Sequence, residues 1–362
     1  MAGQALPTWT HTPIYAAVRA AVGAFQFFPI EQNLRTMRAL GEAMGRAPWN
    51  RGRLRRAIDN LAWCFPEWTA EQHEAAAIEA YRRLFGLAVE MAFTPRLITR
   101  DGWANRVRLG EFGPALERMI RGGPTLLITG HCGNWEVLGY TLAELGFPMH
   151  ALYRPLDLKP LDRWVRETRA GAGLELLDKF GAAHRMPEIL RKGEPVAFIA
   201  DQNAGDRGLF VPFFDRLASA YKSIGLLAMR FDTPIVCGSA RSTPRPDPSG
   251  RPYRAAPGAD FHYEIDVVDI IYPEDWKPQP DPLFYITARY RRAIETMVRR
   301  APEQYLWMHR FWKSRPSFEK EGKPMPARLK DKIAALPWTT PESLARIEDR
   351  AARDAAAAVA GR

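Results

Sequence analysis

The chain has 362 residues, of which 46% are hydrophobic and 25% charged, a globular composition that excludes global disorder. Lysine and arginine exceed aspartate and glutamate by 51 to 41, and the net charge of +10 favours anionic partners such as lipid headgroups, phosphorylated substrates or an acidic protein. Nucleic acid is the weakest of these candidates, because the basic residues are spread along the chain and no nucleic-acid-binding signature occurs.

The first 105 residues are predicted to be helical. Residues 69–72 read Thr-Ala-Glu-Gln, a capping box, and apolar residues recur at helical spacing over 74–93. The sequence has no run of 18 apolar residues and no small-residue cleavage site, so we expect neither a transmembrane helix nor a signal peptide. Residues 13–30 include Arg19 and favour an amphipathic segment that binds a membrane surface.

Aromatic residues in short polar contexts leave two interpretations open, core packing or a rim at a membrane interface. These residues are Phe25, Phe27, Phe28, Trp49, Trp63 and Trp68.

Residues 106–316 alternate between strand and helix patterns. Strands are predicted at 125–129, 149–153, 174–177, 195–200, 234–240 and 261–267, and helices at 137–145, 161–170, 183–192, 219–231 and 282–300. This order predicts an α/β fold with a helix-flanked, mostly parallel sheet, which places a site at the carboxyl ends of the strands.

Two further segments differ in composition from this core. Residues 243–258 are rich in Pro, Gly and Arg and are predicted to form a surface loop or hairpin. Residues 317–362 are charged and rich in alanine, and we expect a marginal helix or a disordered tail there. The chain is therefore divided into a helical appendage (1–105), an α/β domain (106–316) and a tail (317–362).

The segment Gly-His-Cys-Gly-Asn-Trp-Glu at 130–136 is the strongest candidate for a site. It joins a predicted buried strand to a predicted helix, with glycines that permit a tight turn and Asn134 as a helix N-cap. A turn of this kind can bring the Glu136 carboxylate close enough to orient the His131 imidazole as a general base. The alternative is a histidine that only caps a buried turn.

Other polar residues follow predicted strands and are candidates for substrate binding. Arg154 could bind a phosphate or an oxyanion, or form a surface ion pair. Asp201 and Gln202 suit contacts to substrate hydroxyls or support of the histidine, although Asp201 could simply form a turn. Asn134 is the fourth candidate substrate ligand.

Several other chemistries lack their sequence signals. No serine-hydrolase elbow, phosphate-binding loop or complete dinucleotide fingerprint occurs, and the seven histidines show no metal-binding spacing. The three cysteines, Cys64, Cys132 and Cys237, are far apart, which favours a reducing compartment over a disulfide framework. Cys132 could be a nucleophile, but we interpret it as a small apolar filler. A reaction without metal or cofactor remains.

Five ordered blocks of sequence resemble the lipid A biosynthesis acyltransferases, the lauroyl and myristoyl transferases within the wider glycerolipid acyltransferase superfamily with its His-x4-Asp/Glu signature. The blocks are Asn-Leu-Ala-Trp-Cys-Phe-Pro-Glu at 60–67, Gly-His-x-Gly-Asn-Trp-Glu at 130–136, Tyr-Arg-Pro at 153–155, Asp-Gln at 201–202 with Val-Pro-Phe-Phe at 211–214, and Pro-Glu-Gln-Tyr-Leu-Trp-Met-His-Arg at 302–310. Together they span roughly residues 50–316.

This resemblance implies a fold of the glycerolipid acyltransferase type and a transfer of a fatty acyl group from an acyl-carrier-protein thioester to a hydroxyl of a phosphorylated lipid A precursor. It also implies that His131 is the general base, assisted by Glu136, and that the protein lies on the cytoplasmic face of the inner membrane as a peripheral or monotopic protein. Two alternatives stay open: acylation of another glycolipid or an amino lipid, and a membrane-docking protein with a degenerate site.

Overall fold

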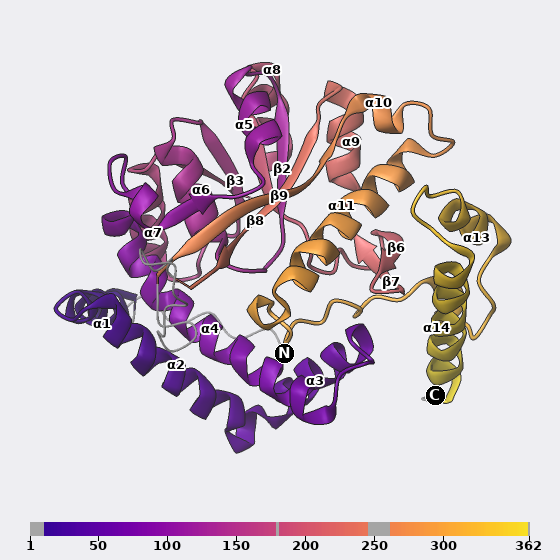
Figure 1. The fold of residues 1–362 in the computed structure, drawn as a ribbon, viewed down its shortest axis with the longest axis horizontal. Coiled ribbons are helices and arrows are strands. Elements are labelled where there is room, and N and C mark those ends of the chain that lie inside the picture. Colours follow the sequence, from indigo (N-terminus) through magenta and orange to yellow (C-terminus); the bar gives the residue numbers. More distant parts are fainter. Residues whose placement is uncertain (1–10, 179–180, 245–260, 361–362) are drawn as a thin grey trace.

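One seven-stranded sheet forms the centre of the computed structural model, which describes residues 11–178, 181–244 and 261–360 (Figure 1). The strands lie in the order β1 (Val107–Leu109), β9 (Tyr263–Ile271), β8 (Ile235–Ser242), β2 (Thr125–Thr129), β5 (Pro195–Ile199), β3 (Met149–Tyr153) and β4 (Leu174–Asp178). Neighbouring strands are parallel except for β8 and β9, which are antiparallel. The predicted α/β class with a mostly parallel sheet is confirmed.

Both faces of the sheet are covered. In β2 all five residues are buried, and Leu126 and Ile128 belong to one hydrophobic cluster whereas Leu127 belongs to a second. Successive side chains of a strand point to opposite faces, so the two clusters lie on the two sides of the sheet. Burial of both faces explains why this strand is a continuous apolar run rather than an alternating one.

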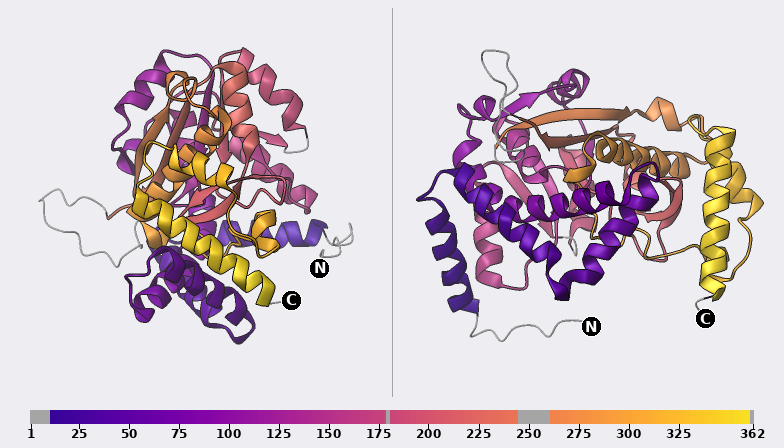
Figure 2. Two further views of the ribbon diagram at one scale, coloured as in Figure 1. Left: turned by 90° about the vertical axis from the view of Figure 1, so that its right-hand side faces the viewer. Right: turned by 60° about the horizontal axis from the view of Figure 1, so that its bottom comes forward.

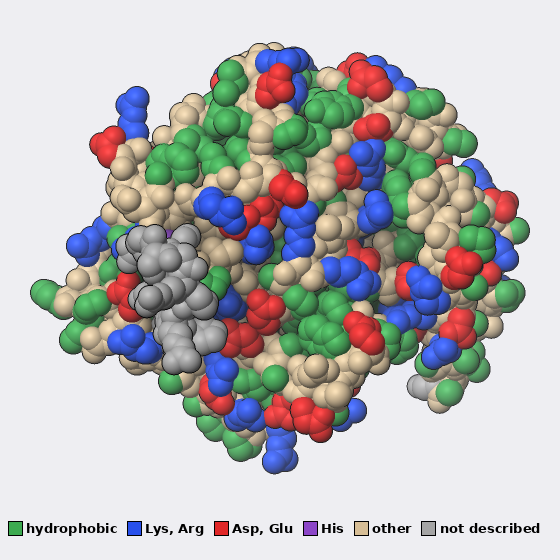
Figure 3. Space-filling model, viewed as in Figure 1, with side chains coloured by type: hydrophobic (Ala, Val, Ile, Leu, Met, Phe, Trp, Pro, Cys, Tyr) green, Lys and Arg blue, Asp and Glu red, His purple; other side chains and the backbone are tan. Residues whose placement is uncertain are grey.

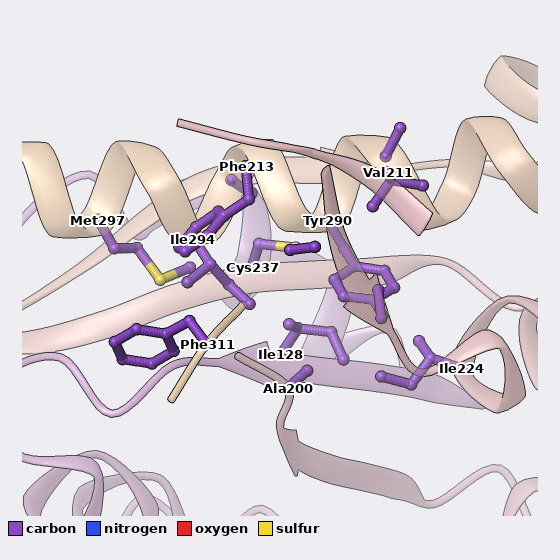
Figure 4. Packing of buried hydrophobic residues seen from close by; sticks show 14 of the residues in the cluster. Ile128, Ala200, Val211, Phe213, Ile224, Cys237, Tyr290, Ile294, Met297 and Phe311 are labelled. Carbon is purple, nitrogen blue, oxygen red and sulfur yellow. The ribbon is translucent and has the colours of Figure 1, made fainter. Parts of the chain in front are cut away.

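Helices from different parts of the chain cover the two faces. The first cluster includes residues of α8 (Ala182–Arg191), α9 (Lys222–Phe231) and α11 (Pro282–Arg300). Figure 4 shows Tyr290 and Ile294 of α11 packed close to Ile128 and Cys237 of the sheet. The second cluster includes residues of α4 (Ala70–Leu97), α5 (Gly113–Ile120) and α6 (Trp135–Glu144). Helix α7 (Lys159–Ala170) packs against β4.

The N-terminal region is helical, as predicted, and lies along one side of the molecule (Figures 1 and 2). It consists of α1 (His11–Phe25), α2 (Ile30–Arg46), α3 (Arg51–Cys64) and α4. The capping box at the start of α4 is confirmed, because the Thr69 and Gln72 side chains each bind the other's backbone N–H. Helices α2 and α4 pack closely, since a Cβ at Gly41 would lie 2.6 Å from the Tyr81 carbonyl oxygen.

The C-terminal region differs from the expected marginal helix or disordered tail. It forms α12 (Ser317–Lys320), α13 (Ala327–Ala334) and α14 (Pro341–Ala360). Asp354 of α14 accepts hydrogen bonds from Arg216 at 2.7 and 2.8 Å and from Arg315 at 2.6 Å. Ile347, Ala351 and Ala355 are buried on one face of α14. Composition alone missed this docking because the partners lie far away in the sequence.

A second difference concerns the segment before α9. Helix α9 begins at Lys222, whereas the sequence predicted a helix from residue 219. The residues before it form an antiparallel hairpin of β6 (Leu209–Phe213) and β7 (Arg216–Ala220). The tight turn of this hairpin holds Phe214 and Asp215 at φ of +52°, which few non-glycine residues adopt, so no turn signal marked it. The predicted loop at 243–258 falls almost entirely outside the described residues.

Candidate active site

His131 lies in the turn that joins β2 to α6, as the sequence predicted. Gly133 has a φ of +64°, and a Cβ there would lie only 1.9 Å from the Ala240 carbonyl oxygen, so the turn requires glycine. The Asn134 side-chain oxygen accepts hydrogen bonds from the N–H groups of Glu136 and Val137, both at 3.0 Å, and so caps α6. The turn is therefore fixed by its own sequence.

The carboxylate that binds His131 is Asp201. His131 Nδ1 lies 2.7 Å from Asp201 Oδ1, and the His131 backbone N–H donates to Asp201 Oδ2 at 2.9 Å. Strands β2 and β5 are adjacent and parallel with Thr129 paired to Ile199, so the residues two positions beyond each strand end meet. A neutral imidazole that donates from Nδ1 keeps Nε2 available to accept a proton.

Burial and the partner's charge shift the pKa values of His131 and Asp201 in opposite directions. Burial favours the neutral imidazole, but the charge of Asp201 and its hydrogen bond outweigh burial and raise the pKa of His131 above its usual value. Burial would likewise raise the pKa of Asp201, which is fully buried, yet the His131 charge and hydrogen bonds lower it to about 2. Asp201 is therefore ionised at neutral pH and stabilises an imidazolium.

Glu136 has a different partner, which corrects the expectation that it orients the imidazole. Arg169 of α7 forms a two-pronged ion pair with Glu136, in which Arg169 Nε donates to Oε2 at 2.9 Å and Nη2 donates to Oε1. Both side chains are buried. Glu136 thus ties the start of α6 to the end of α7. No local sequence signal marks Arg169 as this partner, because it lies 33 residues away from Glu136.

The other predicted site residues separate into two groups. Arg154 and Gln202 line a cavity beside His131, and Arg154 is exposed at its edge. Asn134 has no free polar atom to offer a substrate, because its oxygen caps α6 and its amide nitrogen donates to Glu90 at 2.8 Å. Its predicted role in substrate binding is therefore replaced by support of the turn.

Two residues near Asp201 escaped prediction. Arg291 of α11 is fully buried, donates to the Ala200 carbonyl oxygen at 3.2 Å and lowers the pKa of Asp201 by its charge. Tyr305 is also buried, and both burial and the Asp201 charge raise the pKa of its hydroxyl, so it stays protonated. Tyr305 belongs to the 302–310 block, but the sequence pattern did not assign it to the site. Arg291 lies in an amphipathic helix where nothing distinguishes it from the exposed arginines.

Two further titratable groups lie close to the His131 imidazole, His309 and the adjacent Cys132. The His309 ring lies 5.5 Å from the His131 ring, and its pKa is lowered by burial and by the His131 charge. Cys132 is buried, and burial raises the pKa of its thiol to about 12. A thiol that stays protonated is a poor nucleophile, which supports the interpretation of Cys132 as a filler.

An apolar cavity of about 450 Å³ opens beside His131. It runs between the sheet and α6, whose inward residues Trp135, Leu138, Gly139 and Leu142 lead away from the histidine. Strand residues such as Leu127 and Ala197 form the opposite wall, and Glu136, Arg154, Arg169 and Gln202 supply its polar lining. A basic imidazole at one end of an apolar cavity can deprotonate an alcohol next to a bound hydrocarbon chain. Within the described residues, no group of three or more His, Cys, Asp or Glu is arranged to hold a metal ion.

The chain matches a known protein family over most of its length. Residues 5–314 match the model of the family described as bacterial lipid A biosynthesis acyltransferase. The chain belongs to this family. Members of the family that resemble it include the lipid A biosynthesis palmitoleoyltransferase of Escherichia coli, 30% identical over 270 residues that cover 72% of this chain and 78% of the relative. The lipid A biosynthesis lauroyltransferase of the same organism is 27% identical over 264 residues, covering 71% and 78%. The predicted resemblance is confirmed, and the chain is an acyltransferase.

Replacing Asp201 separates the roles of the two acidic residues. We expect Asp201→Asn to lower turnover by roughly 10³- to 10⁴-fold, since the imidazole loses its orientation and its counter-charge. His131 acts as a base only when neutral, and Asp201 raises its pKa. The acidic limb of the pH–rate profile should therefore move to lower pH in Asp201→Asn. Steady-state rates of acyl transfer between pH 5 and 9 measure both effects.

Glu136→Gln is the matched control for that experiment. It removes a buried carboxylate of the same turn but leaves the His131–Asp201 contact intact, so its acidic limb should stay where the wild type has it. A limb that moves in Glu136→Gln and stays in place in Asp201→Asn would refute the assignment of Asp201.

Proposed function

We propose that the chain transfers a fatty acyl group from an acyl-carrier-protein thioester to a hydroxyl of a phosphorylated lipid A precursor. The observation that carries the proposal is the His131–Asp201 pair at the mouth of an apolar cavity of about 450 Å³. The family membership and the helix-flanked sheet favour a fold of the glycerolipid acyltransferase type. An intact, fully buried acid partner for the histidine argues against a degenerate site.

The chemistry needs one base that later acts as an acid. His131 Nε2 takes the proton of the acceptor hydroxyl as its oxygen attacks the thioester carbonyl, and the tetrahedral intermediate carries the negative charge on the former carbonyl oxygen. When the intermediate collapses, the C–S bond breaks and the thiolate takes the proton back from the imidazolium. The products are an ester and a free carrier thiol. Asp201, ionised because its pKa is about 2, stabilises the imidazolium throughout.

The apolar cavity is suited to hold the acyl chain. Its lining passes from His131 along one face of α6 to Leu142, so a chain whose carbonyl lies at the histidine would extend along this helix. Gly139 lines the middle of this path, and a Cβ there would already contact Leu174 at 3.4 Å, so a larger side chain would narrow the cavity. Arg154 and Gln202 lie where they can bind the oxyanion or acceptor hydroxyls.

The acyl carrier protein is proposed as donor because such proteins are acidic and this chain carries a net charge of +10. Figure 3 shows Lys and Arg side chains interleaved with Asp and Glu side chains on one face, so the excess is not gathered there into a single patch. Docking would therefore rely on a local set of basic residues, with Arg154 at the cavity reserved for the oxyanion or the acceptor.

We also propose that the protein binds peripherally to the cytoplasmic face of the inner membrane. No helix in the described part of the chain is long and apolar enough to cross a bilayer. Helix α1 has no buried residue, and the turn after it exposes Phe27 by 87% and Phe28 by 52%. Exposed aromatic rings on a helical surface are suited to insertion at a membrane interface.

The proposed activity predicts a change in lipid A mass. Deletion of the gene should leave lipid A lighter by one fatty acyl group, and the wild-type gene should restore the mass. A gene carrying His131→Ala should not restore it, because loss of a general base lowers the rate roughly 10²- to 10⁴-fold. His184→Ala, which changes an exposed histidine of α8, is the control that should restore it. Unaltered lipid A in the deletion strain, or restoration by His131→Ala, would contradict the proposal.

The cavity predicts how acyl chains are selected. Gly139→Leu places a side chain across the cavity, so we expect it to shift the preference toward shorter acyl groups in a competition between carrier-bound acyl chains of different lengths. Gly52→Leu is the control, because Gly52 also lies in a helix but a Cβ there meets no atom within 4 Å. An unchanged chain-length distribution in folded Gly139→Leu would place the acyl chain elsewhere.

If Phe27 and Phe28 insert into the membrane, replacing both should weaken binding of the protein to lipid vesicles. The double variant Phe27→Ser and Phe28→Ser should sediment less with vesicles that contain anionic lipid, while its melting temperature stays close to that of the wild type. Leu226→Ser removes an exposed apolar side chain of α9 and should bind vesicles normally. Equal binding by all three proteins would rule out this surface as the membrane contact.

A further inference from the structure

A second, smaller recess also contacts His131. His131 and Trp135 line both cavities, but most of the other residues of the recess come from α2, α4 and the segment 304–306, which do not line the acyl cavity. Its volume is about 40 Å³, which is room for a group the size of a few water molecules. The histidine therefore lies between an apolar cavity and a compact recess of different chemistry.

Two arginines of the N-terminal helices line this recess. Arg38 of α2 and Arg83 of α4 both contact the same oxygen of Glu79, at 2.7 and 3.1 Å. The Arg83 Nε contact is out of hydrogen-bond alignment, so among the described residues this buried N–H has no acceptor. Glu79 is also shared with Arg82, at 3.4 Å. The Glu79 carboxylate is thus shared by the guanidinium groups of Arg38, Arg82 and Arg83.

The remaining acid of the recess adds little compensation. Glu90 is half-buried, and its desolvation raises its pKa despite the hydrogen bonds from Tyr263 and Asn134. Burial thus opposes the charged form of Glu90, and Arg38 and Arg83 outnumber it in the lining of the recess. The recess has an excess of positive charge and an unused N–H donor close to the proposed base. This is the chemistry that binds a phosphate or another oxyanion.

We propose that Arg83 and Arg38 form a subsite for an anionic phosphate group of the glycolipid acceptor, which brings the acceptor hydroxyl to His131. The proposal rests on the proposed function. Arginine suits this role because its planar guanidinium can donate two hydrogen bonds to a phosphate. Because Glu79 is shared among three arginines, it does not fully neutralise Arg38 and Arg83, and their positive charge can attract the ligand.

The position of the recess favours the acceptor over the phosphate of the donor's pantetheine arm. Helix α2 carries Arg38 and exposes apolar side chains along its length, with Phe28 just before it, Leu40 within it and Trp49 just after it. Exposed Leu84 of α4 lies in the lining of the recess itself. A lipid anchored at this surface reaches the recess directly. The acyl chain of the donor occupies the other cavity.

The test compares arginine variants on two acceptors. Arg83→Met and Arg38→Met should each raise the KM for the phosphorylated acceptor about tenfold or more, since each variant loses a charge-assisted hydrogen bond to the phosphate. The turnover number and the KM for acyl carrier protein should stay near those of the wild type. With an acceptor whose phosphates have been removed enzymatically, the variants and the wild type should behave alike.

Arg82→Met is the matched control. Arg82 precedes Arg83 in the same helix and contacts the same Glu79, but it does not line the recess, so its KM values should match the wild type. Arg83→Lys keeps the charge and should recover part of the affinity, and it replaces Arg83→Met if that variant is unstable.

The subsite would be overturned by an equal rise of KM on both acceptors, by a rise in the KM for acyl carrier protein instead, or by an effect of Arg82→Met as large as that of Arg83→Met. A wild-type protein that transfers no acyl group to either acceptor would instead refute the proposed function, and the subsite with it. Transfer at normal KM by both methionine variants would refute the subsite alone.

Discussion

The site depends on one constraint, the burial of an ionised carboxylate at the end of β5. Asp201 has no exposed surface, and an uncompensated buried charge would cost several kcal/mol. The protein compensates it with the His131 side chain and backbone N–H and with the charge of Arg291. Because the carboxylate follows β5 and its compensating groups follow β2 or lie in α11, all three elements must be in place before the carboxylate is stable. The histidine is fixed as a consequence.

Arg291, which helps to compensate the charge of Asp201, is itself buried in the hydrophobic core. Its guanidinium lies over the Phe213 ring at 4.1 Å, and one of its N–H groups binds the Ala200 carbonyl oxygen. Phe213 (labelled in Figure 4) belongs to the β6–β7 hairpin, so the hairpin covers the buried cation. The cation cannot move to solvent without opening this packing. The hairpin, which has no role in the proposed chemistry, thereby helps to keep Asp201 ionised.

The two acidic residues close to His131, Asp201 and Glu136, have different partners. Asp201 binds the imidazole, and Glu136 binds Arg169 across the wall of the apolar cavity. A helix N-terminus favours a carboxylate in its first turn, which is where Glu136 lies. The five-residue spacing of His131 and Glu136 therefore reflects the turn and the start of α6. The acid–base pair is instead His131 and Asp201, which lie 70 residues apart in the sequence.

The sequence predicted the elements whose signals are local. The strands at 125–129 and 149–153 and the helix at 282–300 have the predicted bounds, because each is a regular apolar pattern with clear ends. The hairpin was missed because no turn signal marked Phe214 and Asp215, and the docking of α14 was missed because its partners lie far away in the sequence. His131 and Asp201 were each recognised as candidates, but their contact required knowing that β2 and β5 are neighbours. Arg169 and Arg291 had no signal in the sequence pattern.

The central claim is that His131 donates from Nδ1 to Asp201 and keeps Nε2 as the proton acceptor. Nitrogen-15 NMR of histidine-labelled protein, with the His131 signals assigned by comparison with His131→Gln, measures this directly. We predict an Nδ1–H tautomer at neutral pH, with a pKa above the usual histidine value that falls in Asp201→Asn and stays in Glu136→Gln. An Nε2–H tautomer for His131, or a pKa that responds to Glu136→Gln and not to Asp201→Asn, would contradict the account.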